Sequence, residues 1–226
     1  MRRSGGSYRD TRRWEAGFEG IYAVLDSSIC NDLIALLDVV LRAGVRIVQY
    51  RSKSGIDRGV FSNMSRRARD AGAVLIVNDD LDAACEADGL HVGQEDLAMF
   101  AGVPLRERLG RRILGISCAT AAQALEAELL GADYVGVGPF NSTQSKNDAG
   151  SAIGERGVRA VAQATSLPIA AIGGITVADL ESVSRSGARM AAIISAIAKP
   201  PHGDPESAAR ALVAQWASMH RRVEAT

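Results

Sequence analysis

Two hydroxyls and an ammonium group lie within four residues of one another, shortly after an apolar run. The run Tyr134–Val137 predicts a buried strand, and it ends in a Gly-Pro turn before Thr143, Ser145 and Lys146. Hydroxyl donors with one point charge just beyond a strand end suit a phosphate or a pyrophosphate. The same segment alone is equally typical of an ordinary polar loop, so the hypothesis depends on the residues that come after the other apolar runs.

A second basic segment comes after an earlier apolar run, in the order Gln-Tyr-Arg-Ser-Lys. If the backbone stays extended, the alternation of side chains puts Gln49, Arg51 and Lys53 on one side. On a surface strand this pattern would be a solvated edge. Beside Lys146 it indicates a highly anionic ligand such as a diphosphate, because clustered cations repel one another without one.

Two carboxylates, Asp79 and Asp96, come after the next two apolar runs. Carboxylates beside a polyphosphate need a cation between them, and Mg²⁺ prefers one or two carboxylates together with phosphate oxygens and water. The sequence therefore predicts a Mg²⁺ site at these residues. Asp80 is instead predicted to cap a helix that starts at Leu81.

Small residues after the last two apolar runs predict a second anion site. Gly173 and Gly174 permit close backbone approach, and Ser195 comes after the final run. In a closed parallel barrel, phosphates commonly bind after strands seven and eight. His91 lies in an apolar run, where a packed, hydrogen-bonded histidine is more typical than a metal ligand.

The elements that must position these residues are short, continuous runs rich in Val and Ile. Continuous rather than alternating patterning is typical of parallel strands buried on both faces. The predicted strands are Ile21–Leu25, Val45–Gln49, Val74–Val77, Leu90–Val92, Ile113–Ile116, Tyr134–Val137, Ile169–Ile172 and Met190–Ile194.

Helical signals fill the intervals between these runs. Apolar residues from Ile29 to Leu41 have helical spacing and stop at Gly44. Capping signals that precede further helices are Thr120 with Gln123, Thr176 with Asp179, and Asp204-Pro205. Eight strand–helix units predict an α/β fold, a single (β/α)₈ TIM barrel. An open doubly wound sheet is the alternative, and the lack of a G-x-G-x-x-G after the first strand disfavours it.

Composition limits the partners and the compartment. The 226 residues are 47% apolar with zero formal net charge, which gives no reason to expect nucleic acid, and no run reaches the ~18 apolar residues of a membrane span. Three scattered cysteines without a C-x-x-C predict a reducing, cytoplasmic location. Residues 1–18, rich in Arg, are predicted to be a disordered tail, and residues 19–222 the barrel. Whether the chain forms a homo-oligomer is left open.

The same residues carry a family resemblance. From about Gly20 to Trp216 the chain resembles the thiamine-phosphate synthase family. Each motif alone is weak, but seven occur in order and each lies at a predicted strand end. They are Q-x-R-x-K (49–53), I-V-N-D (76–79), H-x-G-Q-E-D (91–96), G-x-S (115–117), G-V-G-P with T-x-[ST]-K (136–146), I-G-G-I (172–175) and I-S-A-I (194–197).

The resemblance implies a transferase that joins a pyrimidine diphosphate to a thiazole phosphate with Mg²⁺, which Asp79 and Asp96 would hold. The resemblance assigns the pyrimidine diphosphate to Gln49, Arg51, Lys53, Asn78, Ser117 and Lys146, and the thiazole phosphate to Thr143, Ser145, Gly174, Ile194 and Ser195. Tyr50, Ser52 and Gln144 complete the expected substrate-binding set, and Arg51, Lys53, Ser117 and Lys146 are the expected catalytic residues.

Departures from the family pattern are small. Ser52 replaces an acidic residue, Asn141-Ser142 replaces an aromatic-proline type of pair, and Ser145 replaces a threonine. Two other functions stay open at this point: a thiazole-phosphate tautomerase-like relative, which would lack the pyrophosphate cluster, and a non-catalytic binder of thiamine intermediates.

Overall fold

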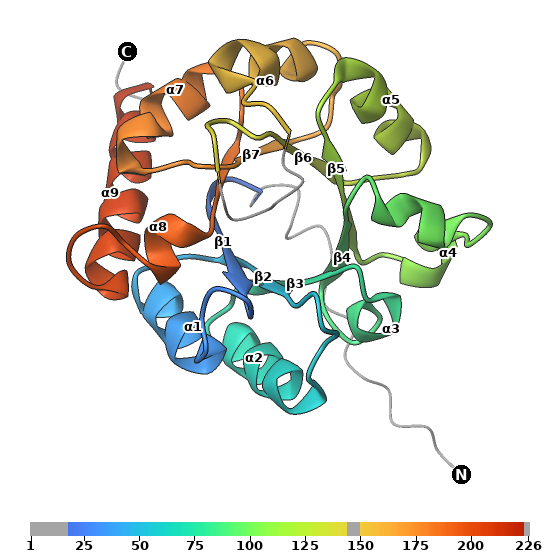
Figure 1. Ribbon diagram of the computed structural model, residues 1–226, viewed down its shortest axis with the longest axis horizontal. Coiled ribbons are helices and arrows are strands. Elements are labelled where there is room, and N and C mark those ends of the chain that lie inside the picture. The colour runs from blue at the N-terminus through green and yellow to red at the C-terminus, as the bar shows by residue number, and fades with distance from the viewer. Residues whose placement is uncertain (1–17, 144–149, 224–226) are drawn as a thin grey trace.

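The strands pair in chain order and the eighth pairs with the first, so a closed parallel barrel forms (Figure 1). The computed structural model describes residues 18–143 and 150–223. The strands are β1 (Gly20–Asp26), β2 (Ile47–Arg51), β3 (Val74–Asn78), β4 (Gly89–Val92), β5 (Ile113–Cys118), β6 (Tyr134–Val137), β7 (Ile169–Ile172) and β8 (Met190–Ile193).

Helices surround the barrel and cover its outer face (Figure 1). The α-helices are α1 (Leu33–Arg42), α2 (Arg58–Asp70), α3 (Leu81–Ala84), α4 (Leu105–Leu109), α5 (Ala121–Leu129), α6 (Gly154–Ala162), α7 (Leu180–Arg185), α8 (Ser195–Ala198) and α9 (Pro205–Val223). Two short 3₁₀ helices, η2 (Asp96–Phe100) and η3 (Val177–Asp179), precede α4 and α7. In the described part of the chain, no helix combines the length and the apolar character needed to cross a membrane.

The predicted caps form. The Asp80 side chain accepts a hydrogen bond from the Ala83 backbone N–H at 2.8 Å and so begins α3. Thr120 with Gln123 and Thr176 with Asp179 form capping boxes, and Asp204 accepts from the first backbone N–H groups of α9. These bonds satisfy donors that each helix start would otherwise leave unpaired.

Alternation along the strands separates two apolar cores. On β1, Ala23 and Leu25 point outward and pack against the helices, whereas Tyr22 and Val24 point into the barrel. The inner core contains Phe18, Tyr22, Val24, Ile47, Ile76, Ile113, Tyr134, Ala170, Met190 and Ala192. This inner core closes the amino-terminal part of the barrel, so space for a ligand is left towards the carboxyl ends of the strands.

Glycines make room for the large inner side chains. A Cβ at Gly115 would lie 2.2 Å from Cζ of Tyr134, and one at Gly136 would lie 3.0 Å from Cε1 of His91. Interiors are packed at near-crystalline density, so two aromatic rings fit inside this barrel only because their neighbours lack side chains.

The predicted strands are confirmed within two residues at either end, but three details differ. Strand β2 ends at Arg51, and Lys53 lies in the turn after it, so the extended run is shorter than expected. Ile29 lies in a turn, because Asp32 caps α1 and starts the helix at Leu33. Phe18, which the sequence assigns to the tail, is buried inside the barrel with its ring 5.3 Å from that of Tyr134.

The substitution Gly115→Ala should destabilise the barrel by about 1–3 kcal/mol, because the added methyl group overlaps a fully buried ring that has no room to move. The measurement is the free energy of unfolding in urea. The matched control is Gly59→Ala in the first turn of α2, where the added Cβ meets only the Asp57 side chain at 3.2 Å. Equal unfolding free energies for the two variants would contradict this packing.

Candidate active site

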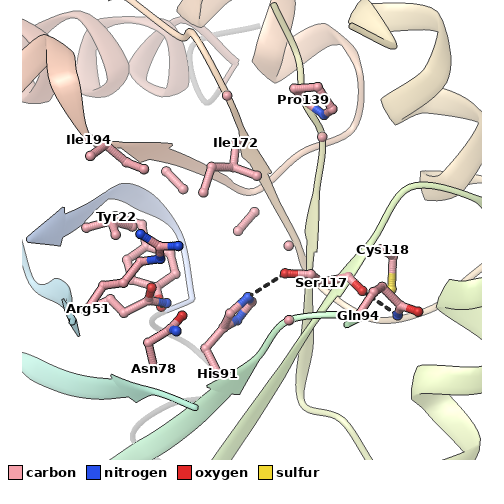
Figure 2. A pocket seen from close by; sticks show the side chains of 18 of the residues that line it. Tyr22, Arg51, Asn78, His91, Gln94, Ser117, Cys118, Pro139, Ile172 and Ile194 are labelled. Atoms are coloured by element: carbon pink, nitrogen blue, oxygen red, sulfur yellow. Dashed lines mark hydrogen bonds between the residues drawn. The ribbon is translucent and has the colours of Figure 1, made fainter. Parts of the chain in front are cut away.

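A cavity of about 270 Å³ opens at the carboxyl ends of the strands, and residues from all eight strand ends line it (Figure 2). In Figure 2, Ile172 and Ile194 lie across the cavity from Asn78 and His91, so an apolar wall faces a polar one. A second hollow of about 740 Å³ adjoins the cavity. The two share Arg51, Asn78, Asp79, Glu95 and Asp96.

Arg51 is held at this shared boundary by a buried carboxylate. Its guanidinium forms an ion pair with Asp26, whose side chain is completely buried, while 12% of the Arg51 side chain stays exposed. Burial alone would raise the pKa of Asp26, but hydrogen bonds from Ser28 and the charge of Arg51 outweigh it and lower that pKa. Asp26 therefore stays ionised and fixes the direction of the cation at the mouth of the cavity.

Asp79, directly after β3, and Asp96, at the start of η2, lie against each other. Asp79 adopts a positive φ of 58°, which Asp tolerates better than most residues, and its Oδ1 accepts from the Gly93 backbone N–H at 3.1 Å. A Cβ at Gly93 would lie 2.5 Å from Oδ2 of Asp96. Gly93 thus supplies a donor to one carboxylate and leaves space for the other.

Burial raises the pKa of Asp79 to about 6, and the negative charge of Asp96 adds to the shift. The Gly93 N–H and Arg51 oppose it without cancelling it. Two carboxylates that repel each other in a partly buried site favour a bound cation. In the described residues, His, Cys, Asp and Glu form no metal-binding group of three or more. A cation here would need further ligands from substrate or water.

The opposite wall is built from two loops that pack tightly together. Asn141 donates from its backbone to the Gly173 carbonyl at 2.9 Å and from its side chain to the Gly174 carbonyl at 3.1 Å. A Cβ at Gly174, where φ is 61°, would lie 2.6 Å from the Ser142 carbonyl oxygen. The glycine pair therefore holds the loop that carries Thr143, as well as exposing backbone to the cavity.

A chain of hydrogen bonds crosses the floor of the cavity. Gln49 Nε2 donates to the Tyr22 hydroxyl at 2.8 Å, and the Tyr22 and Tyr134 hydroxyls lie 2.8 Å apart. Tyr134 is also 2.8 Å from Nδ1 of His91, and Nε2 of His91 is 3.0 Å from Oγ of Ser117, a contact drawn in Figure 2. His91 is thus hydrogen-bonded and packed, as the sequence predicts.

The cavity brings together most of the predicted site residues. Those that line it are Gln49, Arg51, Asn78, Asp79, Asp96, Ser117, Thr143, Gly174, Ile194 and Ser195. Lys53 and Ser52 line only the adjoining hollow. Gln144, Ser145 and Lys146 lie outside the described residues.

Tyr50 is not part of the cavity wall. Its side chain points outward into the core between strands and helices, and its hydroxyl accepts from the Asp57 backbone N–H at 3.2 Å. The alternation that turns Gln49 and Arg51 inward turns the residue between them outward, so the Tyr50 side chain does not belong to the site.

Sequence reasoning missed Asp26, Tyr22 and Tyr134. The signal was present, because all three fall at inward positions once β1 and β6 are read with a period of two. Interpreted only as apolar strands, these two runs give no reason to expect hydroxyl and carboxyl groups inside the barrel.

Comparison with known proteins agrees with this geometry. The family model described as thiamine monophosphate synthase matches residues 21–197. Thiamine-phosphate synthase of Roseiflexus castenholzii is 42% identical over 85% of this chain and 86% of its own length, and that of Archaeoglobus fulgidus is 37% identical over 85% and 91%. The solved thiamine phosphate pyrophosphorylase from Pyrococcus furiosus superposes with a TM-score of 0.78 at 27% identity, covering 89% of this chain and 96% of that one. The chain belongs to the thiamine monophosphate synthase family.

Proposed function

We propose that this protein is a transferase that joins 4-amino-2-methyl-5-(diphosphooxymethyl)pyrimidine to a thiazole phosphate. The bond between the pyrimidinylmethyl carbon and the diphosphate oxygen breaks, and pyrophosphate leaves with the electron pair. The lone pair of the thiazole nitrogen then forms the new carbon–nitrogen bond, which gives thiamine phosphate. Identities of about 40% to proteins named thiamine-phosphate synthase support this reaction.

The observation that carries the proposal is the pair of adjoining hollows with a charged boundary. The inner cavity has the apolar side chains Ile172 and Ile194 to contact aromatic rings. Arg51, Asp79 and Asp96 lie where the cavity meets the outer hollow, which Lys53 also lines. A ring in the cavity with its diphosphate directed outward would match this division of apolar and charged surface.

Asp79 and Asp96 fit a magnesium ion. They supply the one or two carboxylates that Mg²⁺ ordinarily takes from protein. The pKa of Asp79 is raised by burial and further by the charge of Asp96, and a cation would relieve that repulsion. When bound, the ion would neutralise charge that develops on the departing diphosphate.

The side chains of the protein divide into two groups. Arg51, oriented by Asp26, and Lys53 would bind the diphosphate and favour its departure by stabilising negative charge. We assign Lys146 to the same ligand from the sequence motif. Gly174, Ile194 and Ser195 would hold the thiazole phosphate at the other wall, so that the nitrogen faces the reacting carbon. Such positioning needs no general base.

Incubation of the protein with both substrates and Mg²⁺, followed by chromatographic detection of thiamine phosphate and pyrophosphate, tests the function. Equal amounts of the two products are expected. Substrate binding without product would favour the non-catalytic alternative. A cytoplasmic location stays a prediction, and the oligomeric state stays open.

The substitutions Asp79→Asn and Asp96→Asn should each lower turnover by at least ~100-fold, because one electrostatic contact in the transition state typically contributes about 3 kcal/mol. The fold should be kept, because Asn also tolerates the positive φ of residue 79. Steady-state kinetics over a range of Mg²⁺ concentrations measure the loss. Wild-type turnover from both variants, or full activity in EDTA, would remove the metal from the mechanism.

The stability of the metal-free protein should depend on the ionisation of Asp79. Its folded pKa of about 6 lies above the ordinary value of about 3.9, so the stability it contributes is present below pH ~4 and is lost as pH rises through 6. In EDTA, the Tm of wild type relative to Asp79→Asn should therefore fall between pH 5 and pH 8. Mg²⁺ should raise the wild-type Tm more at pH 8 than at pH 5, because protons compete with the metal. A Tm difference that does not change with pH would contradict the raised pKa.

Gly93→Ala should weaken the response to Mg²⁺ with little loss of stability. The added Cβ would displace only the end of the Asp96 side chain, which lies 2.5 Å away, and residue 93 has no positive φ that Ala would strain. We expect the Mg²⁺ concentration for half-maximal activity to rise about tenfold while Tm changes little. An unchanged Mg²⁺ requirement would show that Asp96 does not contact the ion.

The two anion sites should separate by mutation. Gly174→Val would push away the loop that carries Thr143, so KM for the thiazole phosphate should rise most. Lys53→Ala should instead raise KM for the pyrimidine diphosphate, because Lys53 lines the outer hollow. Initial-rate kinetics with each substrate varied in turn give the four KM values. Equal effects of both changes on one substrate would refute the two-site assignment.

A further inference from the structure

The hydrogen-bond chain under the cavity has a defined start. Gln49 Nε2 belongs to an amide NH₂ group, which only donates, so Tyr22 accepts the first bond. Each tyrosine has one hydroxyl proton, and Tyr22 and Tyr134 are fully buried. A buried hydroxyl whose proton lacks an acceptor is costly, so each proton must be used along the chain.

One direction satisfies every donor. Tyr22 donates to Tyr134, and Tyr134 donates to Nδ1 of His91. Nδ1 must then be unprotonated, so the ring proton of neutral His91 is on Nε2 and is donated to Oγ of Ser117. Burial raises the pKa values of Tyr22 and Tyr134 above the ordinary value, so both keep their protons at neutral pH.

Ser117 is the end of the chain that faces the ligand. Its Oγ accepts from His91, its carbonyl accepts from Nε2 of Gln94 at 2.6 Å, and the residue lines the cavity (Figure 2). Because Oγ is already an acceptor towards His91, its own proton is available for the cavity. A ligand that binds there must offer an acceptor such as an unprotonated ring nitrogen.

We propose that Tyr134 and His91 are positioning residues that fix the Ser117 hydroxyl as a hydrogen-bond donor to a ring nitrogen of the pyrimidine. The identity of the ring rests on the proposed function, but the direction of the hydrogen-bond chain is a property of the free protein. That direction assigns Tyr134 and His91 a role that is exerted through Ser117. The opposite direction requires Gln49 to present its oxygen to Tyr22, and then Nδ1 of His91 carries the proton and Ser117 donates to Nε2.

The direction is tested on the free protein by ¹⁵N NMR of the histidine rings at pH 8, where an imidazole is ordinarily neutral. His91 is identified among the three histidines by its absence from the spectrum of His91→Asn. Wild type should show the Nε2–H tautomer. The Nδ1–H tautomer, or a free mixture of both, would overturn the proposal whether or not the protein makes thiamine phosphate.

Two tyrosine variants locate the residue that sets the tautomer. Tyr134→Phe removes the donor to Nδ1, so His91 should become a mixture of tautomers. Tyr22→Phe leaves Tyr134 free to donate, so the Nε2–H form should persist. Tyr50→Phe is the matched control, because it removes a buried hydroxyl outside the barrel and should leave the His91 signals in place. The Nε2–H tautomer in Tyr134→Phe would contradict the assigned role of Tyr134.

Kinetic measurements test whether the hydrogen-bond chain acts on the ligand through Ser117. Tyr134→Phe should lower kcat/KM for the pyrimidine diphosphate by about tenfold, the usual effect of losing one neutral hydrogen bond, and leave KM for the thiazole phosphate unchanged. Added to Ser117→Ala, it should cause no further loss, because the donor that it orients is already absent. Independent, multiplying losses would mean that Tyr134 acts structurally and not through Ser117.

Discussion

Limited interior space in a closed eight-stranded barrel is the constraint on which the site depends. Such a barrel is just wide enough for its own side chains to fill. Here the inner core fills the amino-terminal part. Because Gly115 and Gly136 have no side chains, Tyr134 and His91 fit above that core. The floor of the cavity is consequently polar and hydrogen-bonded, while its volume remains open towards the strand ends. The same few residues therefore contribute both to the stability of the fold and to the ligand cavity.

The buried and mutually repelling charges of this protein lie where the ligand is expected. The buried ion pair of Asp26 with Arg51 holds a cation at the mouth of the cavity, and Asp79 and Asp96 repel each other beside it. The repulsion of the two carboxylates lowers the stability of the empty protein, and a bound cation would relieve it. Such strained electrostatics are typical of functional sites. This arrangement supports the proposal that the ligand is a metal-bound diphosphate.

Strand period and strand-end chemistry were predictable from the sequence, whereas the hydrogen-bond network beneath them was not predicted. Continuous apolar runs predicted the eight strands, and polar residues after each run predicted a common site, because closure of a parallel barrel brings all carboxyl ends together. Tyr50 was misplaced since motif membership was given more weight than alternation. Asp26 and Tyr134 were overlooked because their partners, Arg51 and His91, are distant in sequence and meet them only after closure. The pairing of Asp79 with Asp96 was predictable. That a side chain at Gly93 would collide with Asp96 could be seen only in the structure.

The central claim is that the boundary between the two hollows binds a diphosphate together with Mg²⁺. Isothermal titration of the protein with pyrophosphate, in Mg²⁺ and then in EDTA, tests it most directly. The account predicts binding of one pyrophosphate per chain that is at least ~10-fold tighter with Mg²⁺, a difference of about 1.4 kcal/mol or more. Equal affinity in EDTA, or no binding under either condition, would contradict the account.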